Sequence, residues 1–453
     1  MAADQAPESA AAHAAARTSA PRDGCPARSA YAALVRQLVR MGALPPDLPG
    51  KATDRALAEL LDASPSTLRN WRRCRTRSPQ PRLLERARAR LPRHSAEAHE
   101  LAFLQELTGG ARSIARAAES LVSELQRYTL SASGGWHLYE GPLYLSFNPG
   151  LSPERRGALM ERSGALLEAI LDQGLTHREV PALPELIRYS VHGWHHASRF
   201  DVRRRSVQER VAHVGASYLG RIELALYLGD VCAMPALFAG TPRSAQPYTR
   251  RALALLDEAG PADEDASPIG IGEARVMVRA VEAQILACHG DDRTHARLER
   301  FERHDGASPP SVAWIDSVRL GARGYIALRL RGDPVAAAEA FQVAARQVDA
   351  WLSRVGIPFG STSHFALAAY AMALVGDPER GDTLAHRALL RSLEHNVIVD
   401  EVAARLVLAR LADDRNDTSR ARYHRARGAT LVEAHHLDAW QTALDHLLHR
   451  PPA

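Results

Sequence analysis

The sequence has almost no lysine, few cysteines and no long apolar run. Lys51 is the single lysine, so arginine supplies nearly all of the 57 basic residues. The four cysteines, Cys25, Cys74, Cys232 and Cys288, are far apart and form no CxxC pair, which argues against a disulfide scaffold and a zinc cluster. No apolar run reaches the length of about 18 residues that a membrane-spanning helix needs. We therefore expect a protein without a membrane partner.

Length and composition predict a globular protein of two or three units. The chain has 453 residues, of which 46% are hydrophobic and 24% charged, enough for sizeable cores. Residues 1–28 are rich in alanine and lack the basic start and apolar centre of a secretory signal, so we expect a disordered tail. With no sign of disulfides, the expected location is the cytoplasm.

Positive charge is concentrated in one segment. Residues 28–93 contain 15 basic and 5 acidic residues, a net charge of +10, whereas the whole chain carries +5. A basic segment on a mildly acidic body is typical of a nucleic-acid-binding module attached to a non-binding domain. A solvated, arginine-rich helical surface is the alternative interpretation.

Residues 54–73 have the pattern of two short helices packed back to back. We expect Thr53 to cap the first helix, and Ser64 with Pro65 to start the second. The predicted apolar seam consists of Leu57, Ala58, Leu61, Ala63, Leu68 and Trp71. Polar side chains then fall on exposed faces of the second helix: Ser66, Thr67, Arg69, Asn70, Arg72 and Arg73. This division is what a DNA-recognition helix requires.

This segment resembles the bacterial Cro/repressor-like helix-turn-helix family over about residues 31–92. The similarity includes the exit from the second helix, Trp-Arg-Arg-Cys-Arg-Thr-Arg-Ser-Pro at 71–79. Two features depart from the family: Asp62 stands where the turn usually has glycine, and the link at 42–53 is longer. The alternative is a helical hairpin whose arginines are only solvated.

The resemblance implies DNA contacts from the second helix and its exit. The N-terminal part would enter the major groove and reach base edges or nearby phosphates with Ser64, Ser66, Thr67, Arg69 and Asn70. Later arginines would grip phosphates: Arg72, Arg73, Arg75 and Arg77. Double-stranded DNA is therefore the expected partner, and a homodimer the expected form, because one such motif makes few base contacts.

From about residue 205 the sequence alternates apolar helices with Gly-Asp pairs. The pairs stand at 229–230, 290–291, 332–333 and 376–377, and a looser break follows at 413–417. Regular Gly-centred turns between amphipathic helices predict stacked helical hairpins, that is, an α-solenoid. A plain helical bundle is the alternative.

One hairpin, at 318–351, resembles tetratricopeptide-type repeats. Ala337, Phe341 and Ala344 follow its Gly-Asp turn at the spacing of that family, and Ala385 takes the aromatic position in a weaker copy. The period is longer than the family's, so the resemblance implies tetratricopeptide-like units whose concave face binds a peptide or protein.

Together these patterns predict an all-α fold with one small β-hairpin near 136–147. The hairpin is indicated by aromatic residues on both sides of a Gly-Pro turn, and it is expected to cover a solenoid end or to contact a partner. The expected organisation is as follows: a tail at 1–28, a helix-turn-helix domain at 29–93, a helical connector at 94–204, a repeat domain at 205–446 and a tail at 447–453.

Other candidate sites are weaker. His192, His195 and His196 would share a helical face and could ligate a metal, but Gly193 weakens the helix and no acidic fourth ligand is near in sequence. The arginines at 203–205 could bind phosphate or only start a helix. No nucleotide-binding, metalloprotease or serine-hydrolase motif occurs, so we expect no catalytic residue, metal or cofactor.

The sequence thus predicts a DNA-binding transcriptional regulator whose repeat domain senses a peptide or protein and dimerises. The principal alternative is a scaffold or adaptor whose solenoid recruits protein partners, with the basic head as an accessory contact. A third is an enzyme with a site around residues 192–205.

Overall fold

The computed structural model describes most of the chain in separate stretches. These are Ala30, Tyr31, Ala32, Leu34, Val35, Leu38 and Val39, and residues 49–73, 75, 79–89, 96–128, 153–189, 205–233, 242–265, 267, 269–289, 295–305, 310, 313–355, 363–395, 397–435 and 437–448. Every regular element in these stretches is a helix, which confirms the all-α class. The predicted hairpin at 136–147 lies outside them. None of the described helices is both long and apolar enough to cross a membrane.

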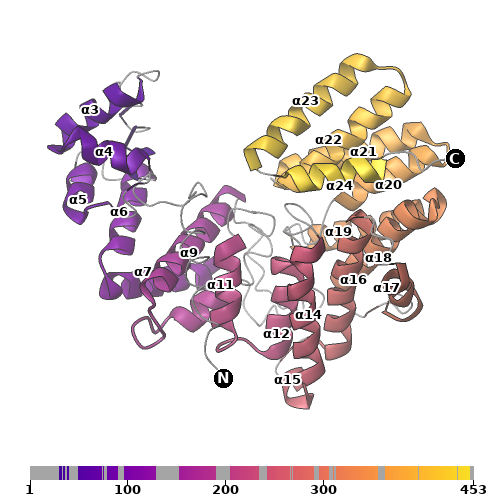
Figure 1. Ribbon diagram of the computed structural model, residues 1–453, viewed down its shortest axis with the longest axis horizontal. Coiled ribbons are helices and arrows are strands. Elements are labelled where there is room, and N and C mark those ends of the chain that lie inside the picture. The colour runs from indigo at the N-terminus through magenta and orange to yellow at the C-terminus, as the bar shows by residue number, and fades with distance from the viewer. Residues whose placement is uncertain are drawn as a thin grey trace, which may run out of the picture. The chain divides into compact units, whose positions relative to one another are not determined.

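Contacts divide the chain into two compact units, which we describe separately. The first contains the residues up to Ala117 together with Arg178–Val180, and the second contains the rest. The first unit holds α3 (Gly50–Leu61), α4 (Pro65–Arg72), α5 (Pro81–Ala89) and α6 (Ala96–Thr108), and α7 (Ala111–Tyr128) runs across the division (Figure 1). Because α6 packs against α5, this unit continues past residue 93, where we expected the domain to end.

The second unit is a succession of helices with short irregular connections (Figure 1). Its α-helices include α9 (Pro153–Gln173), α11 (Arg205–Gly215), α12 (Arg221–Leu226), α14 (Pro242–Glu258), α15 (Pro261–Asp265), α16 (Ile271–His289), α17 (His295–Arg300), α18 (Ala313–Ile326), α19 (Pro334–Val355), α20 (Ser363–Leu374), α21 (Pro378–His395), α22 (Ile398–Asp414), α23 (Thr418–His435) and α24 (Asp438–Leu448). Three π-helical segments continue helices of this series: η3 (Tyr227–Cys232), η5 (Phe301–Asp305) and η6 (Ala327–Arg331).

Three turns between successive helices share one chemistry. Gly332, Gly376 and Asn416 have left-handed backbone, with φ of 59°, 95° and 62°. The residue after each is an aspartate whose carboxylate accepts N–H groups of the next helix, as Asp333 does from Val335 and Ala336. A left-handed residue ends one helix and the aspartate begins the next. The predicted turns at 332–333 and 376–377 are therefore confirmed.

The prediction of a turn at 229–230 is wrong. Both residues lie inside η3, and Asp230 is fully buried. Gly229 is needed there because a Cβ would stand 2.6 Å from Cγ2 of Val278 in α16. The glycine thus permits close helix packing instead of a chain reversal. The pair at 290–291 lies outside the described residues.

Successive helices from α18 to α23 pack against one another, and α20 also packs against α22. Phe341 of α19 is fully buried, with its ring centroid 5.4 Å from that of Tyr325 in α18 and 6.0 Å from that of His364 in α20. Gly324 leaves space for this ring, since a Cβ there would lie 2.7 Å from Phe341 Cε1. The aromatic residue identified in the sequence thus fills the space among three helices.

Two glycines, one in α21 and one in α23, allow a matched test of how closely successive helices pack. At Gly381 of α21 a Cβ would lie 2.7 Å from the backbone oxygen of Ala369, whereas at Gly428 of α23 the nearest atoms are 3.9 Å away. Gly381→Ala should therefore lower the free energy of unfolding by about 1–3 kcal/mol, because backbone must shift. Gly428→Ala should raise it by about 0.5–1 kcal/mol through better helix propensity. Denaturant unfolding of both variants checks this, and equal effects would contradict it.

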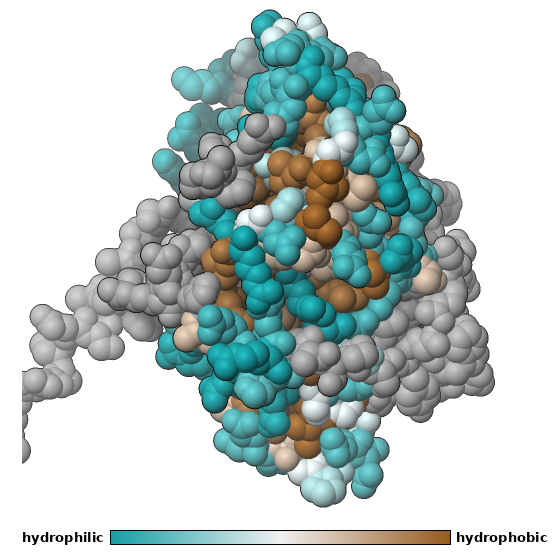
Figure 2. All heavy atoms as spheres, turned by 90° about the vertical axis from the view of Figure 1, so that its right-hand side faces the viewer, coloured by the Kyte–Doolittle hydropathy of each residue, from teal (hydrophilic) through white to brown (hydrophobic). Residues whose placement is uncertain are grey.

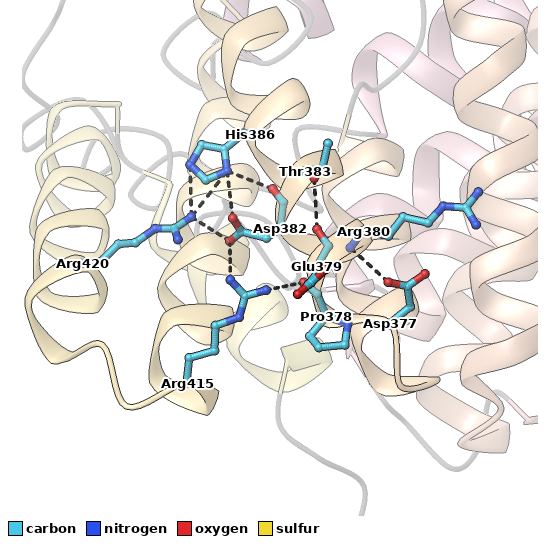
Figure 3. Close-up of polar contacts among 9 residues, drawn as sticks. All are labelled: Asp377, Pro378, Glu379, Arg380, Asp382, Thr383, His386, Arg415 and Arg420. Carbon is cyan, nitrogen blue, oxygen red and sulfur yellow. Dashed lines mark hydrogen bonds and ion pairs between the residues drawn. The ribbon is translucent and has the colours of Figure 1, made fainter.

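A polar cluster joins α21 to the turn between α22 and α23 (Figure 3). Nη2 of Arg420 lies 2.7 Å from Oδ1 of Asp382 and 3.1 Å from Nε2 of His386. Arg415 donates to the backbone oxygen of Pro378 and lies 3.7 Å from Asp382. The cluster therefore links neighbouring helical pairs at their surface. On the face drawn in Figure 2, apolar residues form patches among hydrophilic ones.

His424 of α23 makes the stability of this region depend on pH. Burial, and then the positive charges of Arg405 in α22 and Arg420 in α23, lower its pKa to about 4 from the ordinary 6.5, with His386 acting in the same direction and Asp382 opposing. The folded protein therefore keeps His424 neutral at pH values where the unfolded chain has already bound the proton. The contribution is complete above pH 6.5 and is lost as the pH falls towards 4.

We therefore expect the free energy of unfolding to fall by up to about 3 kcal/mol between pH 6.5 and pH 4 because of His424. In His424→Gln that part of the decrease should disappear. Denaturant unfolding of the wild type and of His424→Gln at a series of pH values measures this decrease. The difference between their free energies of unfolding above pH 6.5 serves as the reference. Parallel curves for the two proteins would contradict the assignment.

Candidate nucleic-acid interface

The seam between α3 and α4 is closed by the apolar residues expected from the sequence. Leu57, Leu68 and Trp71 are fully buried, and Ala58 and Leu61 are 2% and 1% exposed. Ala63, expected in the same set, is only half-buried. The small side chain of Ala58 lets the two helices approach closely. The seam leaves the other side of α4 uncovered by α3.

The turn between the helices is made by Asp62, Ala63 and Ser64. Asp62 has left-handed backbone, with φ 49° and ψ 55°, a conformation that glycine adopts more readily than aspartate. Nη1 of Arg86 in α5 donates to the backbone oxygens of Leu61 and Asp62, at 3.3 and 3.1 Å, and lies 3.3 Å from the Asp62 carboxylate. Arg86 thus satisfies carbonyls at the end of α3 and stabilises the strained residue.

Ser64 is the N-cap of α4, as the sequence predicted. Its hydroxyl accepts the backbone N–H of Thr67 at 3.1 Å and lies 2.8 Å from the hydroxyls of Ser66 and Thr67, while Pro65 occupies the first helical position. The start of α3 differs from expectation. That helix begins at Gly50, and Thr53 is buried within its first turn, where its hydroxyl donates to the backbone oxygen of Pro49.

A buried carboxylate, Asp54 of α3, ties α4 to the rest of the unit. Nε and Nη2 of Arg72 donate to Asp54 Oδ1 and Oδ2 at 3.0 and 2.9 Å, and the Tyr31 hydroxyl donates to Oδ1 at 2.9 Å. Burial alone would raise the pKa of Asp54, but the bonds from Arg72 and Tyr31 outweigh it and lower that pKa. Burial, followed by Asp54, raises the pKa of Tyr31.

This arrangement corrects the expected role of Arg72. The sequence placed it on an exposed face, ready for phosphate, but its guanidinium holds Asp54 through two parallel hydrogen bonds and is 32% exposed. It lies four residues after Leu68, on the side of α4 that meets α3. Such a bidentate pair fixes the angle between the helices.

The remaining candidates differ in exposure. Ser64, Ser66, Arg73 and Arg75 are exposed, Thr67 and Asn70 are half-buried, and the Arg69 side chain is 44% exposed. Nε of Arg69 lies 3.9 Å from Asp54 Oδ2, too far for a hydrogen bond. Arg77 lies outside the described residues.

The described residues around α4 add further positive charge to the unit. Exposed basic side chains lie on α3 and α5 as well as on α4 and its exit: Lys51, Arg55, Arg73, Arg75, Arg82, Arg86 and Arg88. Exposed acidic side chains in the same region are fewer, namely Glu59, Asp62 and Glu85. Asp62 is paired with Arg86, while Asp54 is buried and paired with Arg72. The surface that α4 presents is thus suited to polyanions.

Sequence reasoning missed Asp54, Tyr31 and Arg86. A signal for Asp54 was present, because it stands three and four residues before Leu57 and Ala58 on the buried stripe of α3. An acidic residue at such a position requires a buried partner. Which basic residue supplies it depends on how α4 crosses α3, and sequence spacing within one helix does not contain that information.

Other candidate sites have less support. His192, His195, His196, Arg203 and Arg204 lie outside the described residues. In the part of the chain that is described, no three side chains of metal-ligating type come together to hold an ion.

A cavity of about 240 Å³ lies between α16 and the segment formed by α17 and η5. Its lining residues are Arg279, Glu282, Ala283, Leu286, Arg297, Leu298, Arg300 and Phe301. Nη1 of Arg279 lies 3.2 Å from the Glu282 carboxylate. The lining therefore carries a net positive charge and suits a small anion better than a metal cation.

Comparison with known proteins gives no relatives. No family model, no curated protein and no solved structure matches this chain. The geometry of the molecule itself is therefore the basis for any functional conclusion.

Proposed function

We propose that this protein is a sequence-specific DNA-binding transcriptional regulator, with α3 and α4 as a helix-turn-helix. The observation that carries the proposal is the seam of Leu57, Leu61, Leu68 and Trp71, which buries one side of α4 and leaves its other side lined with hydrogen-bonding groups. The exposed, capped N-terminus of α4 also supports it, because this end of a recognition helix meets the bases.

In this proposal the side chains of α4 divide into two kinds of contact. Arg69 and Asn70 read bases, since guanidinium pairs with guanine and carboxamide with adenine through two hydrogen bonds each. Ser64, Ser66 and Thr67 donate to nearby phosphates or base edges, and Arg73, Arg75 and Arg77 bind phosphates. Arg72 instead holds α4 in position through Asp54.

The second unit serves in this proposal as a tetratricopeptide-like solenoid that senses a peptide or protein and dimerises. Support comes from the repeated pattern of a left-handed residue, an aspartate cap and a new helix, and from the packing of successive helices from α18 to α23. A dimer would place two recognition helices on a two-fold operator. A ligand would change the affinity for DNA only to the extent that it binds one arrangement of the dimer's two helix-turn-helix units more tightly than another.

The test is a selection of DNA by the full chain. Purified protein is incubated with genomic fragments or random duplexes, and bound DNA is sequenced for the wild type and for the Arg69→Ala, Asn70→Ala double variant. Enrichment of one motif by the wild type alone supports the proposal. No enrichment above the double variant would overturn it and favour the alternative of a scaffold whose solenoid recruits protein partners.

A further inference from the structure

The last described helix, α24, is amphipathic and is held by one face. Its fully or nearly fully buried residues, with the residue just before it, recur at helical spacing: Leu437, Trp440, Ala443, Leu444, Leu447 and Leu448. Asp438 and Thr442, on the other side, are exposed. A helix with one wide apolar stripe is the form in which helical segments bind grooves of other proteins.

The helices beneath α24 are buried on all sides. Ten of the 12 residues of α20 and 13 of the 17 of α22 are buried. By contrast α21 and α23 each present an exposed face, which includes Leu390 and Tyr423. In two-layered stacked hairpins, the inner helices would be expected to expose one face. Here that face is covered.

Part of this cover is α24. It packs against α22, α23 and α16, although α16 ends about 150 residues earlier in the sequence. Figure 1 shows α24 running beside α22, and the Tyr370 hydroxyl of α20 reaches the last residue of α24. The preceding helices α19, α21 and α23 each pack closely against the helix before them, whereas α24 extends over several non-consecutive helices.

Two side-chain hydrogen bonds set the direction and register of α24. The indole N–H of Trp440 donates to the backbone oxygen of Val399 in α22 at 3.0 Å. The Tyr370 hydroxyl of α20 donates to the backbone oxygen of Leu448 at 2.8 Å. Carbonyls in the last turn of a helix have no partner within the helix. The surface thus offers an acceptor for an indole and a donor for a helix end.

We propose that the surface of α16, α20 and α22 beneath α24 is a helix-binding groove. Its resident occupant is α24, and a protein partner enters by presenting an amphipathic helix with tryptophan and leucines at the spacing of Trp440, Leu444 and Leu447. The groove gives a site to the sensing role proposed above, and its part in regulation rests on that proposed function. Binding of the partner helix itself does not require DNA. Replacement of α24 by the partner's helix would couple partner binding to the conformation of the second unit.

The chemistry of the groove selects its partner. Tryptophan is favoured over phenylalanine, because the indole N–H donates to the backbone oxygen of Val399 and a benzene ring has no donor to replace it. The leucines supply buried apolar area, and the Tyr370 hydroxyl donates to a carbonyl at the C-terminal end of the bound helix, which fixes the direction of that helix. A partner with the same residues in reversed order does not satisfy both hydrogen bonds.

The proposal is tested with a labelled synthetic peptide of residues 437–449 and the full chain. Leu444→Asp places a charge in the apolar face and weakens the seating of α24, whereas Thr442→Asp puts the same charge on the exposed side. We expect the peptide to bind Leu444→Asp at least tenfold more tightly than either the wild type or Thr442→Asp. A peptide with Trp440→Phe should bind about fivefold more weakly, the effect of one hydrogen bond.

Hydrogen exchange of the wild type gives a second, independent measurement. If α24 leaves the groove while the repeats stay folded, its amides exchange faster than those of α22. The proposal is overturned if both helices exchange only together, or if folded Leu444→Asp does not bind the peptide. Should that variant fail to fold, the exchange rates of the wild type decide. Neither readout involves DNA, so a failure here is distinct from a failure of operator selection.

Discussion

Replacing both Arg69 and Asn70 with alanine is expected to lower the preference for the operator over random DNA by about 30- to 25,000-fold. The expectation follows from the roughly 1–3 kcal/mol that each two-bonded side-chain contact to a base contributes. Neither residue belongs to the buried seam of α3 and α4, so the helices should remain folded. Competition binding with labelled operator and random duplexes measures the ratio, and circular dichroism checks the fold.

Arg73→Ala is the matched control for that loss. Arg73 is exposed and follows α4, where a side chain meets phosphates. Its removal should weaken binding to all sequences alike and reduce the slope of log affinity against log salt by about 1. If the double variant kept the preference of the wild type, α4 would not be the reading element.

Asp54→Ala is expected to destabilise the first unit by about 2–3 kcal/mol. The substitution leaves Arg72 and the Tyr31 hydroxyl without their shared acceptor, and the cost is that of lost hydrogen bonds to a charged group, because the Arg72 side chain is 32% exposed and stays partly solvated. Specific DNA binding should fall as well, because α4 loses the contact that sets its angle to α3. Hydrogen exchange of the amides in α3 and α4 reports the stability of this unit separately from the second.

Glu59→Ala provides the comparison for Asp54→Ala. Glu59 is an acidic residue of the same helix but is exposed, so its removal should change stability by no more than about 0.5 kcal/mol. Arg72→Ala should resemble Asp54→Ala, and Arg73→Ala should resemble Glu59→Ala in stability. Equal stabilities for Asp54→Ala and Glu59→Ala would show that the buried pair does not hold the helices.

The seam of α3 and α4 and several repeat turns were predictable because both depend on local spacing. Apolar residues three and four apart share a helical face, so Leu57, Leu61, Leu68 and Trp71 were expected inside and are buried. Gly332 and Gly376, each before an aspartate, were expected at turns because left-handed backbone favours glycine.

Local spacing gave wrong predictions for residues whose type is compatible with more than one structural role. Gly229 before Asp230 has the sequence of a turn, yet it allows η3 to lie against Val278. Arg72 was expected to face solvent, yet Asp54 of the other helix reaches it. In both cases the deciding contact comes from another helix, distant in sequence.

The sequence by itself therefore determined the helical class, the apolar seam and the repeated turns, since helix periodicity and backbone conformation are properties of neighbouring residues. Only the tertiary structure decided that Asp54 joins Tyr31 to Arg72 and that α24 packs against α16 and α22 and meets Tyr370 of α20. These contacts join residues up to about 150 positions apart, and the energy that selects them comes from packing and burial, which no local pattern encodes.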